Sequence, residues 1–370
     1  MIDILIVGGG LAGLTNALLL SRKGYKVLLV EKKQYPFDKV CGEYVSNEVS
    51  SFLRSIEAFP KGEYPQINRF QLSSISGRSH TVPLRMGGFG ISRYTFDHFL
   101  YEKAKEAGAS FLLNCQVQKI TFKNDNFQVL MRNGESLESR IVIGAYGKNS
   151  GLDRQMNRRF TTKRSPFIGV KYHIKYDFPE DLVALHNFKD GYCGLAAIEN
   201  GKVNLCYLGQ RNDLRKYGNI EEMEKKILYR NPFLKEVFSN AEFIYGKPEV
   251  INEISFEPKT AVEQHVLMSG DTAGLISPLC GNGMAMAIHS AKILSSQIHQ
   301  YYSQRSFDRV ALEKSYTSSW NSNFSRRLWV GRNVQKLFGT AISSEILISL
   351  ATTFPPLVSW IIKQTHGKQI

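Results

Sequence analysis

The chain has 370 residues, of which 43% are apolar and 22% are charged, with 30 glycines and 12 prolines. Because this length exceeds the size at which one core usually stops growing, we expect two domains, and the composition excludes a disordered, collagen-like or coiled-coil chain. The 47 Lys and Arg against 33 Asp and Glu give a net charge of +14, which suggests nucleic acid or an anionic membrane as partners until the motifs are considered.

The first thirty residues predict a strand, a glycine-rich turn, a helix and a second strand. An apolar run at residues 4–7 precedes the turn, and residues 14–23 carry the apolar spacing of a helix. Residues 26–30 predict a buried strand that ends at an acid, Glu31. This order is typical of a dinucleotide-binding βαβ unit, whose Gly-x-Gly-x-x-Gly spacing is formed here by Gly8, Gly10 and Gly13.

Each part of this unit has a physical role in holding a pyrophosphate and a ribose. The first glycine permits the tight turn, the second lets the backbone approach the pyrophosphate, and the third lets helix and strand pack closely. The helix N-terminus at Leu11 and Ala12 offers free N–H groups and partial positive charge. Glu31, followed by Lys32, stands about 20 residues past the glycines, where an acid accepts hydrogen bonds from a ribose. We therefore predict a site for FAD or NAD.

A second segment, near residue 270, favours FAD. A short strand at residues 266–268 precedes Ser-Gly-Asp-Thr-Ala-Gly, another glycine-rich turn and a long helix over residues 285–300. This pattern resembles the flavin-binding segment of FAD-dependent oxidoreductases of the geranylgeranyl reductase and aromatic-ring hydroxylase (p-hydroxybenzoate hydroxylase-like) superfamily. An N-capped helix after a glycine turn is the alternative interpretation. The resemblance implies that Asp271 binds the ribityl chain and that the flavin edge meets Pro278, Gly281, Asn282, Gly283 and Met284.

Three further segments resemble the same family. Residues 39–43 resemble the reductase segment near the isoalloxazine ring, and residues 90–97 resemble the start of a helix whose arginine contacts FAD. That helix is expected to run over residues 94–106, and the strand after it leads to residues 114–117, where the backbone meets the adenine in the family. The resemblance implies FAD contacts from Lys39, Cys41, Gly42, Arg93, Val117 and Gly147.

The chain also departs from the family pattern at two positions. Tyr146 stands where the family usually has an Asp that supports nicotinamide access, and Gly274 replaces a His found in the hydroxylases. A second glycine fingerprint in a strand-helix context is not found, so a separate nicotinamide domain is not expected. NAD(P)H or another electron donor would then bind transiently at the flavin face.

Between residues 166 and 256 the pattern changes to strands. Apolar alternation predicts strands at residues 167–176 and 182–188, and a hairpin at residues 192–208 around Asn200-Gly201. An amphipathic helix is expected over Asn219–Phe238.

These patterns predict an α/β fold. In it, a Rossmann-like FAD-binding domain of the glutathione reductase type (βαβ) is interleaved with a mostly antiparallel β-sheet substrate domain and C-terminal helices. We expect the FAD-binding domain to combine residues 1–63, 91–160 and 258–303, the substrate domain to combine residues 64–90 and 161–257, and the helical region to cover residues 304–370.

The resemblance implies an enzyme and leaves two reactions open. The favoured one is C=C reduction, by flavin hydride transfer, of a hydrophobic small molecule that is isoprenoid, lipid or polyketide-like. The alternative is an NAD(P)H-dependent flavin monooxygenase that hydroxylates a phenolic or lipid-like substrate through a C4a-hydroperoxide. An FAD protein without turnover, serving as an electron carrier or sensor, is the third hypothesis. The catalytic candidates are Cys41, Tyr192 and Glu43. Each also has a purely structural interpretation: Cys41 as a small buried thiol, Tyr192 as a core tyrosine and Glu43 as a partner in a loop salt bridge.

The cysteines and the apolar stretches indicate the cellular compartment in which the protein is expected. The five cysteines are odd in number and form no Cys-x-x-Cys pair, so neither a disulfide framework nor a metal site is predicted, and a reducing compartment is favoured. The N-terminal residues lack a basic leader, and Glu345 and Pro355 interrupt the apolar stretch over residues 337–362. We expect a cytoplasmic protein.

The positive charge concentrates at residues 154–164 and 326–336. Phosphate of a nicotinamide nucleotide or an anionic membrane surface would suit these stretches. Because no nucleic-acid-binding motif accompanies them, nucleic acid is not expected as a partner. The aromatic and basic tail predicts either helices packed on the substrate domain or a rim in peripheral contact with a membrane.

Overall fold

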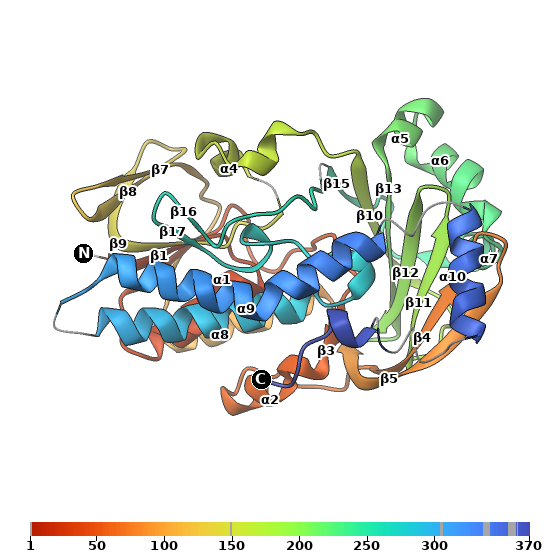
Figure 1. The fold of residues 1–370 in the computed structure, drawn as a ribbon, viewed down its shortest axis with the longest axis horizontal. Helices are drawn as coiled ribbons and strands as arrows, with labels where there is room; N and C mark the ends of the chain where they lie inside the picture. Colours follow the sequence, from red (N-terminus) through yellow and green to blue (C-terminus); the bar gives the residue numbers. More distant parts are fainter. Residues whose placement is uncertain are drawn as a thin grey trace.

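The structure is a computed structural model, and it places two β-sheets side by side with long helices against the first (Figure 1). It describes residues 2–148, 150–252, 254–303, 306–335, 341–353, 360 and 362–370. Parts of the predicted C-terminal helical region, including Lys336 of the second basic stretch, therefore lie outside the described residues.

The first sheet contains β1 (Ile2–Val7), β2 (Val27–Val30), β6 (Ser110–Leu112), β7 (Val117–Lys123), β8 (Asn126–Met131), β9 (Ser136–Gly144), β16 (Val262–Glu263) and β17 (Val266–Met268). Its order is β16-β17-β9-β1-β2-β6, and β1 pairs in parallel with β2 and β9. Ile4, Leu5 and Ile6 are completely buried, as expected of a central parallel strand covered on both faces. The predicted Rossmann-like unit is therefore present.

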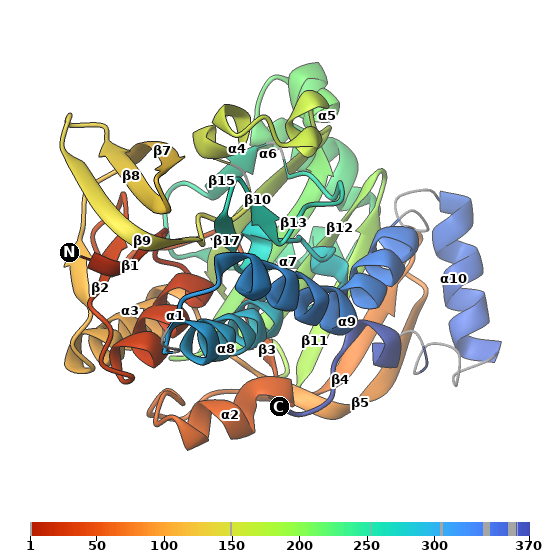
Figure 2. The ribbon, with the colours of Figure 1, turned by 60° about the vertical axis from the view of Figure 1, so that its left-hand side comes forward.

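Four helices pack on this sheet or on each other: α1 (Leu11–Ser21), α3 (Arg93–Glu106), α8 (Gly283–Tyr302) and α9 (Arg309–Gln335). α1 contacts both α3 and α8, and α8 contacts α9, so the helices follow one another across the molecule (Figure 2). The predicted starts of α1, α3 and α8 are confirmed to within three residues. This packing holds the N-termini of α1 and α8 at the edge of the sheet, which is where parallel strands place their ligands.

The second sheet contains β3 (Tyr44–Ser46), β4 (Gln66–Ser73), β5 (Ser79–Gly90), β10 (Phe167–Lys175), β11 (Leu182–Phe188), β12 (Gly191–Ile198), β13 (Lys202–Gln210), β14 (Glu242–Phe243) and β15 (Glu249–Asn252). Its order is β14-β10-β13-β12-β11-β4-β5-β3, with β15 also on β10. Neighbouring strands are antiparallel except β11 and β4. The hairpin of β12 and β13 turns at Asn200 and Gly201, both with positive φ, as predicted.

The prediction of a single helix over Asn219–Phe238 is wrong. The structure has α5 (Arg211–Tyr217), α6 (Ile220–Ile227), the short 3-10 turn η3 (Leu228–Arg230) and α7 (Pro232–Asn240). Pro232 has no N–H for a helical bond, so a new helix begins there, and Asn231 accepts a hydrogen bond from Phe233 N at 3.0 Å. The three helices cover the second sheet through a separate apolar cluster.

The remaining elements are short or peripheral: η1 (Asn47–Val49), α2 (Ser50–Ser55), α4 (Gly151–Gln155), η2 (Arg159–Thr162), η4 (Gly270–Thr272), η5 (Pro278–Cys280) and α10 (Ala341–Thr353). β3 belongs to the second sheet although it lies within residues 1–63, so the chain passes between the sheets more often than expected. The domain boundaries themselves stay a prediction. Among the described residues, no helix combines the length and apolar character needed to cross a membrane.

Candidate functional site

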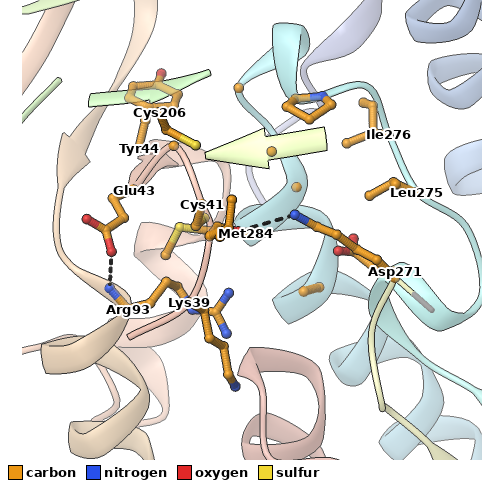
Figure 3. A pocket seen from close by; sticks show the side chains of 18 of the residues that line it. Lys39, Cys41, Glu43, Tyr44, Arg93, Cys206, Asp271, Leu275, Ile276 and Met284 are labelled. Atoms are coloured by element: carbon orange, nitrogen blue, oxygen red, sulfur yellow. Dashed lines mark hydrogen bonds between the residues drawn. The ribbon is translucent and has the colours of Figure 1, made fainter. Parts of the chain in front are cut away.

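One cavity of about 550 Å³ runs from the glycine turn of the first sheet to the apolar face of the second. In Figure 3, Glu43 and Arg93 lie on one side and Asp271, Leu275 and Ile276 on the other. The structure brings almost all predicted site residues into its lining: Gly8, Gly10, Leu11, Ala12, Glu31, Lys32, Lys39, Cys41, Gly42, Glu43, Arg93, Gly147, Tyr192, Asp271, Pro278, Gly281, Asn282, Gly283 and Met284. Segments as far apart in the chain as Gly8 and Met284, 276 residues, therefore share one site.

The glycine turn leaves room and free N–H groups at the start of α1. Gly10 is the N-cap residue and provides no side chain to occupy those groups. Gly8 has a φ of +102°, and a Cβ atom on Gly13 would overlap the Gly8 carbonyl oxygen. Gly13 is outside the cavity lining, and its close approach to Gly8 agrees with the packing role predicted for the third glycine.

A cationic pair stands beside this helix start. A Cβ atom on Gly10 would lie 3.4 Å from Arg93 Nη2 and 3.6 Å from Lys39 Nζ. Both cations contact the buried Asp97, Lys39 at 2.9 Å and Arg93 through Nε at 2.7 Å. Burial alone would raise the pKa of Asp97, but Arg93 and Lys39 outweigh it and lower that pKa. Two cations share one carboxylate, so net positive charge remains for an anion at the turn.

Glu31 lies at the other end of the turn and is almost fully buried. Its Oε2 accepts a hydrogen bond from Gly9 N at 2.7 Å, and its Oε1 accepts one from Lys33 N at 3.1 Å. Tyr35 donates to the Gly9 carbonyl oxygen at 2.6 Å. The bonds from Gly9 N and Lys33 N hold the Glu31 carboxylate at the cavity wall, and a carboxylate retains further lone pairs for ligand hydroxyls.

Glu43 belongs to a cluster of charged side chains, most of them buried, that links the segment 38–43 to β10. Its Oε1 accepts hydrogen bonds from Lys171 Nζ at 2.6 Å and Arg93 N at 2.8 Å, and its Oε2 lies 2.6 Å from His173 Nε2. Lys171 also contacts Asp38 at 3.0 Å. Burial alone would lower the pKa of Lys171, but Glu43 and Asp38 raise it. Lys171 therefore stays charged.

The same cluster bears on metal binding. Asp38, Glu43 and His173 offer ligand atoms within 4.8 Å of one another. The Lys171 ammonium contacts both carboxylates, so it already supplies the positive charge and would repel a cation.

The opposite wall is built from η4, η5 and the start of α8. Lys259 donates to the Asp271 carbonyl oxygen at 2.9 Å and to the Lys148 carbonyl oxygen at 2.8 Å. Gly147 N donates to Thr272 Oγ1 at 2.8 Å, so the loop after β9 and the segment around Asp271 are held together. This joins two separately predicted cofactor segments into one surface.

Three predicted positions need separate comment. Val117 is buried in β7 and is not part of the cavity lining, so its contact with adenine stays a prediction. Tyr146, at the family's Asp position, lines the cavity and donates to Asp153 Oδ1 at 3.3 Å. Tyr192 lines the apolar end, and burial raises its pKa well above the usual value, so its hydroxyl stays protonated at neutral pH.

Sequence reasoning missed Asp97, Lys171 and the C-terminal residues Thr365 and His366. Asp97 follows Arg93 by one helical turn, a spacing that could have signalled the ion pair. Lys171 directly follows the apolar run of residues 167–170 in β10 and is buried there, which is an unusual position for a lysine. The C-terminal residues line the cavity, and no local signal marks them.

Comparisons with known proteins agree with this geometry. A family model described as an NAD(P)-binding Rossmann-like domain matches residues 6–70. The chain is 24% identical to conditioned medium factor receptor 1 of Dictyostelium discoideum, over 87% of this chain and 68% of that protein. It is 26% identical to digeranylgeranylglycerophospholipid reductase of Methanosarcina acetivorans, over 94% of this chain and 87% of the reductase.

Solved structures show the same architecture. The flavin-dependent brominase Bmp2 superposes with a TM-score of 0.76 at 19% identity, covering 98% of this chain and 93% of the brominase. A geranylgeranyl bacteriochlorophyll reductase-like protein of Thermoplasma acidophilum superposes with a TM-score of 0.74 at 20% identity, covering 97% and 98%. These likenesses confirm the predicted α/β fold and the predicted resemblance to geranylgeranyl reductase-like flavoproteins.

Proposed function

We propose that this protein is an FAD-dependent oxidoreductase that reduces a C=C bond in a hydrophobic, isoprenoid or lipid-like molecule. The observation that carries the proposal is the continuity of the cavity. Its polar end holds the glycine turn and the cationic pair, and its other end is lined by side chains such as Leu72, Leu185 and Leu275. The similarity to a digeranylgeranylglycerophospholipid reductase over most of both chains supports this substrate class.

The residues present fit an FAD molecule. The free N–H groups of α1, with Lys39 and Arg93, would hold the pyrophosphate, and Glu31 would accept hydrogen bonds from the ribose. Asp271 and the N-terminus of α8 would hold the ribityl chain and the flavin edge. A bound flavin would supply hydride transfer. The chain's own task is then to orient the substrate, exclude water and provide a proton.

The surroundings of the three catalytic candidates favour a different role for each. Tyr192 keeps its proton at neutral pH because burial raises its pKa. Its hydroxyl therefore suits a hydrogen bond to a substrate group more than proton transfer, which is most efficient when the pKa of the donor lies near the working pH. Cys41 lines the cavity beside the proposed flavin site and is a free thiol. The Glu43 carboxylate is engaged by Lys171, His173 and Arg93 N, an arrangement that favours holding the segment 38–43 in place.

The proposal is tested by cofactor content and anaerobic turnover. The purified protein should bind about one FAD per chain, and the chemically reduced protein should saturate a prenyl substrate without oxygen. Lys39→Met should lower FAD content, whereas Lys175→Met, at an exposed position on β10, should not. A protein that cannot be loaded with FAD contradicts the proposal.

A flavin monooxygenase is the second candidate, favoured by the structural likeness to a flavin-dependent brominase. Oxygen consumption with incorporation of labelled oxygen into the product would select it over the reductase. NAD(P)H oxidation by the FAD-loaded protein would show whether a nicotinamide is the electron donor.

We also propose a peripheral contact with an anionic membrane. Around the C-terminal helices, Trp329 is 62% exposed, Ile346 54%, Leu350 39% and Trp360 54%, and the net charge is +14. Exposed apolar side chains with positive charge favour an anionic bilayer surface. Vesicles containing phosphatidylserine should co-sediment more protein than phosphatidylcholine vesicles, and less at high salt. Trp329→Ser should weaken binding more than the control Tyr245→Ser; equal binding to both lipids contradicts the contact.

A further inference from the structure

The last residues of the chain form part of the cavity wall. Ile362, Thr365 and His366 line the same cavity as Gly281 and Asn282. Ile362 also packs against the apolar cluster around Tyr44 and Leu84 on the second sheet. The C-terminus lies beside α2 in both views (Figures 1 and 2). The chain end thus stands between the proposed flavin edge and the apolar substrate chamber.

A buried carboxylate, that of Glu48, anchors the C-terminal segment through hydrogen bonds. Glu48, in η1, has no exposed surface, and it accepts hydrogen bonds from Arg327 Nη1 at 2.8 Å, Asn282 Nδ2 at 3.0 Å and Gly367 N at 2.8 Å. Its carbonyl oxygen accepts a further bond from Ile370 N at 3.0 Å. Burial alone would raise the pKa of Glu48, but contacts with His289 and Arg327 lower it to about 2. The anchor is therefore charged throughout the neutral pH range.

Two further features show that the segment is fitted to this anchor. A Cβ atom on Gly367 would overlap the Arg327 guanidinium and lie 2.5 Å from Glu48 Oε1, so a larger residue requires these side chains to shift before its N–H reaches the carboxylate. Asn282 Nδ2 also donates to the Thr365 carbonyl oxygen at 3.1 Å. Asn282 is the N-cap residue of α8, so the wall is tied to the segment proposed to hold the flavin edge.

His366 brings one uncommitted polar atom to this wall. Its Nδ1 lies 3.0 Å from the Ile362 carbonyl oxygen, which can only accept, so Nδ1 carries the proton in the neutral ring. Burial lowers the pKa of His366, which favours that neutral ring at pH 7. Nε2 is then a hydrogen-bond acceptor, and among the described residues it has no partner. Thr365, by contrast, donates its hydroxyl to the Ile362 carbonyl oxygen at 2.9 Å.

We propose that residues 362–367 belong to the substrate site and that His366 Nε2 accepts a hydrogen bond from a substrate hydroxyl. This assignment rests on the proposed function, because it takes the apolar end of the cavity as the chamber for an isoprenoid or lipid-like molecule. An acceptor on the cavity wall favours molecules that carry a donor, because a substrate that covers the acceptor without supplying a donor leaves it unpaired. His366 is thus a specificity-determining residue for a hydroxyl-bearing substrate.

The test compares a C20 prenyl alcohol with its methyl ether, which keeps the oxygen, lacks the donor and adds one methyl group. Binding to the FAD-loaded protein is followed by the change in flavin absorbance. The wild-type protein should bind the alcohol about tenfold more tightly, the value of about one net hydrogen bond. His366→Ala should abolish this preference, and His366→Gln, whose amide oxygen accepts, should retain part of it. FAD content and the visible spectrum should stay unchanged in both variants.

A second pair of variants tests the wall. Gly367→Ala should weaken binding of both probes to a similar extent, because the segment must leave its anchor. Gly246→Ala, at an exposed glycine with open space around it, is the matched control and should leave binding unchanged.

The outcomes separate this assignment from the proposed function. A preference that survives His366→Ala overturns the assignment, as does a wild-type protein that binds neither probe. Loss of FAD or a shifted flavin spectrum in His366→Ala also overturns it, because the ring would then serve the cofactor. A wild-type preference that depends on His366, without anaerobic reduction of the prenyl probe, would sustain the hydroxyl site and reject the reductase.

Discussion

At the scale of single residues, a close backbone contact shapes the glycine turn at the proposed pyrophosphate site. Gly13 lies so close to the Gly8 carbonyl oxygen that any side chain would separate α1 from β1. The same contact keeps the start of α1 at the cavity. One atom at this position therefore affects both the packing of the first sheet and the proposed pyrophosphate site.

Gly13→Ala should lower the free energy of unfolding by about 1–3 kcal/mol, because overpacking at a close contact forces the backbone to shift. It should also reduce FAD content. Urea unfolding and flavin absorbance measure the two effects. Gly151→Ala, at a position with no atom within 4 Å, is the control; an equal effect of both substitutions would show that the close approach is unimportant.

A buried carboxylate outside the cavity lining predicts a pH dependence of stability. Glu224 accepts hydrogen bonds from Tyr172 at 2.9 Å and Tyr207 at 2.8 Å, yet burial raises its pKa to about 7. Because the folded pKa exceeds the unfolded value of 4.5, this group's contribution is fully present below pH 4.5. It is lost as pH rises through about 7.

The wild-type protein should therefore lose up to about 3 kcal/mol of stability between pH 4.5 and 8 relative to Glu224→Gln. Urea unfolding of both proteins at several pH values measures this difference. Glu236→Gln, at an exposed position on α7, should show no such trend relative to the wild type. A constant gap between wild type and Glu224→Gln would reject the ionisation of Glu224 as its cause.

At the scale of elements, polar caps decide where the helices on the second sheet begin. Asn231 caps α7 and also donates to the Ser74 and Asn187 carbonyl oxygens, each at 2.9 Å. Asn219 caps α6 by accepting from Glu222 N at 2.8 Å, at an exposed position. Both are N-caps, but only Asn231 is completely buried.

Asn231→Ala should destabilise the protein by about 3 kcal/mol, since it removes a cap and leaves buried carbonyl groups unpaired. Asn219→Ala should cost about 1 kcal/mol, the usual value of an exposed cap. Thermal and urea unfolding of both variants provide the comparison. Equal losses would mean that the buried bonds of Asn231 contribute nothing beyond capping.

At the scale of the whole molecule, buried charge joins the cofactor side to the second sheet. Lys171 on β10 contacts Asp38 and Glu43, which lie in the segment that follows the first βαβ unit. Removing one partner of a buried ion pair leaves the other charge uncompensated. The relative position of the two sheets therefore depends on this cluster.

Lys171→Met should cost about 3–5 kcal/mol and lower FAD content, because the segment 38–43 loses its anchor. Adding Glu43→Gln to Lys171→Met should recover part of the stability, since one buried charge is then removed. Lys175→Met, on the same strand with a 62% exposed side chain, is the control. A double variant less stable than Lys171→Met would contradict the argument from uncompensated charge.

Much of the fold and the polar half of the site could be predicted from the sequence. The strand, glycine turn, helix and acid lie within about thirty residues, and their spacing reflects contacts between near neighbours. The strand, glycine-rich turn and helix around Asp271 could be predicted for the same reason. The prediction of one helix over residues 219–238 was wrong, because the apolar spacing continues across Pro232, where a new helix begins.

Local backbone geometry and periodicity thus sufficed to predict the Rossmann-like sheet, the residues that line the polar end of the cavity and the change to a second sheet. The contacts between groups far apart in the chain arise from tertiary packing alone. Lys171 reaches Glu43 from 128 residues away, and Gly367 reaches Glu48 from 319. Such contacts depend on packing between the sheets and the chain end, and spacing along the chain cannot encode them.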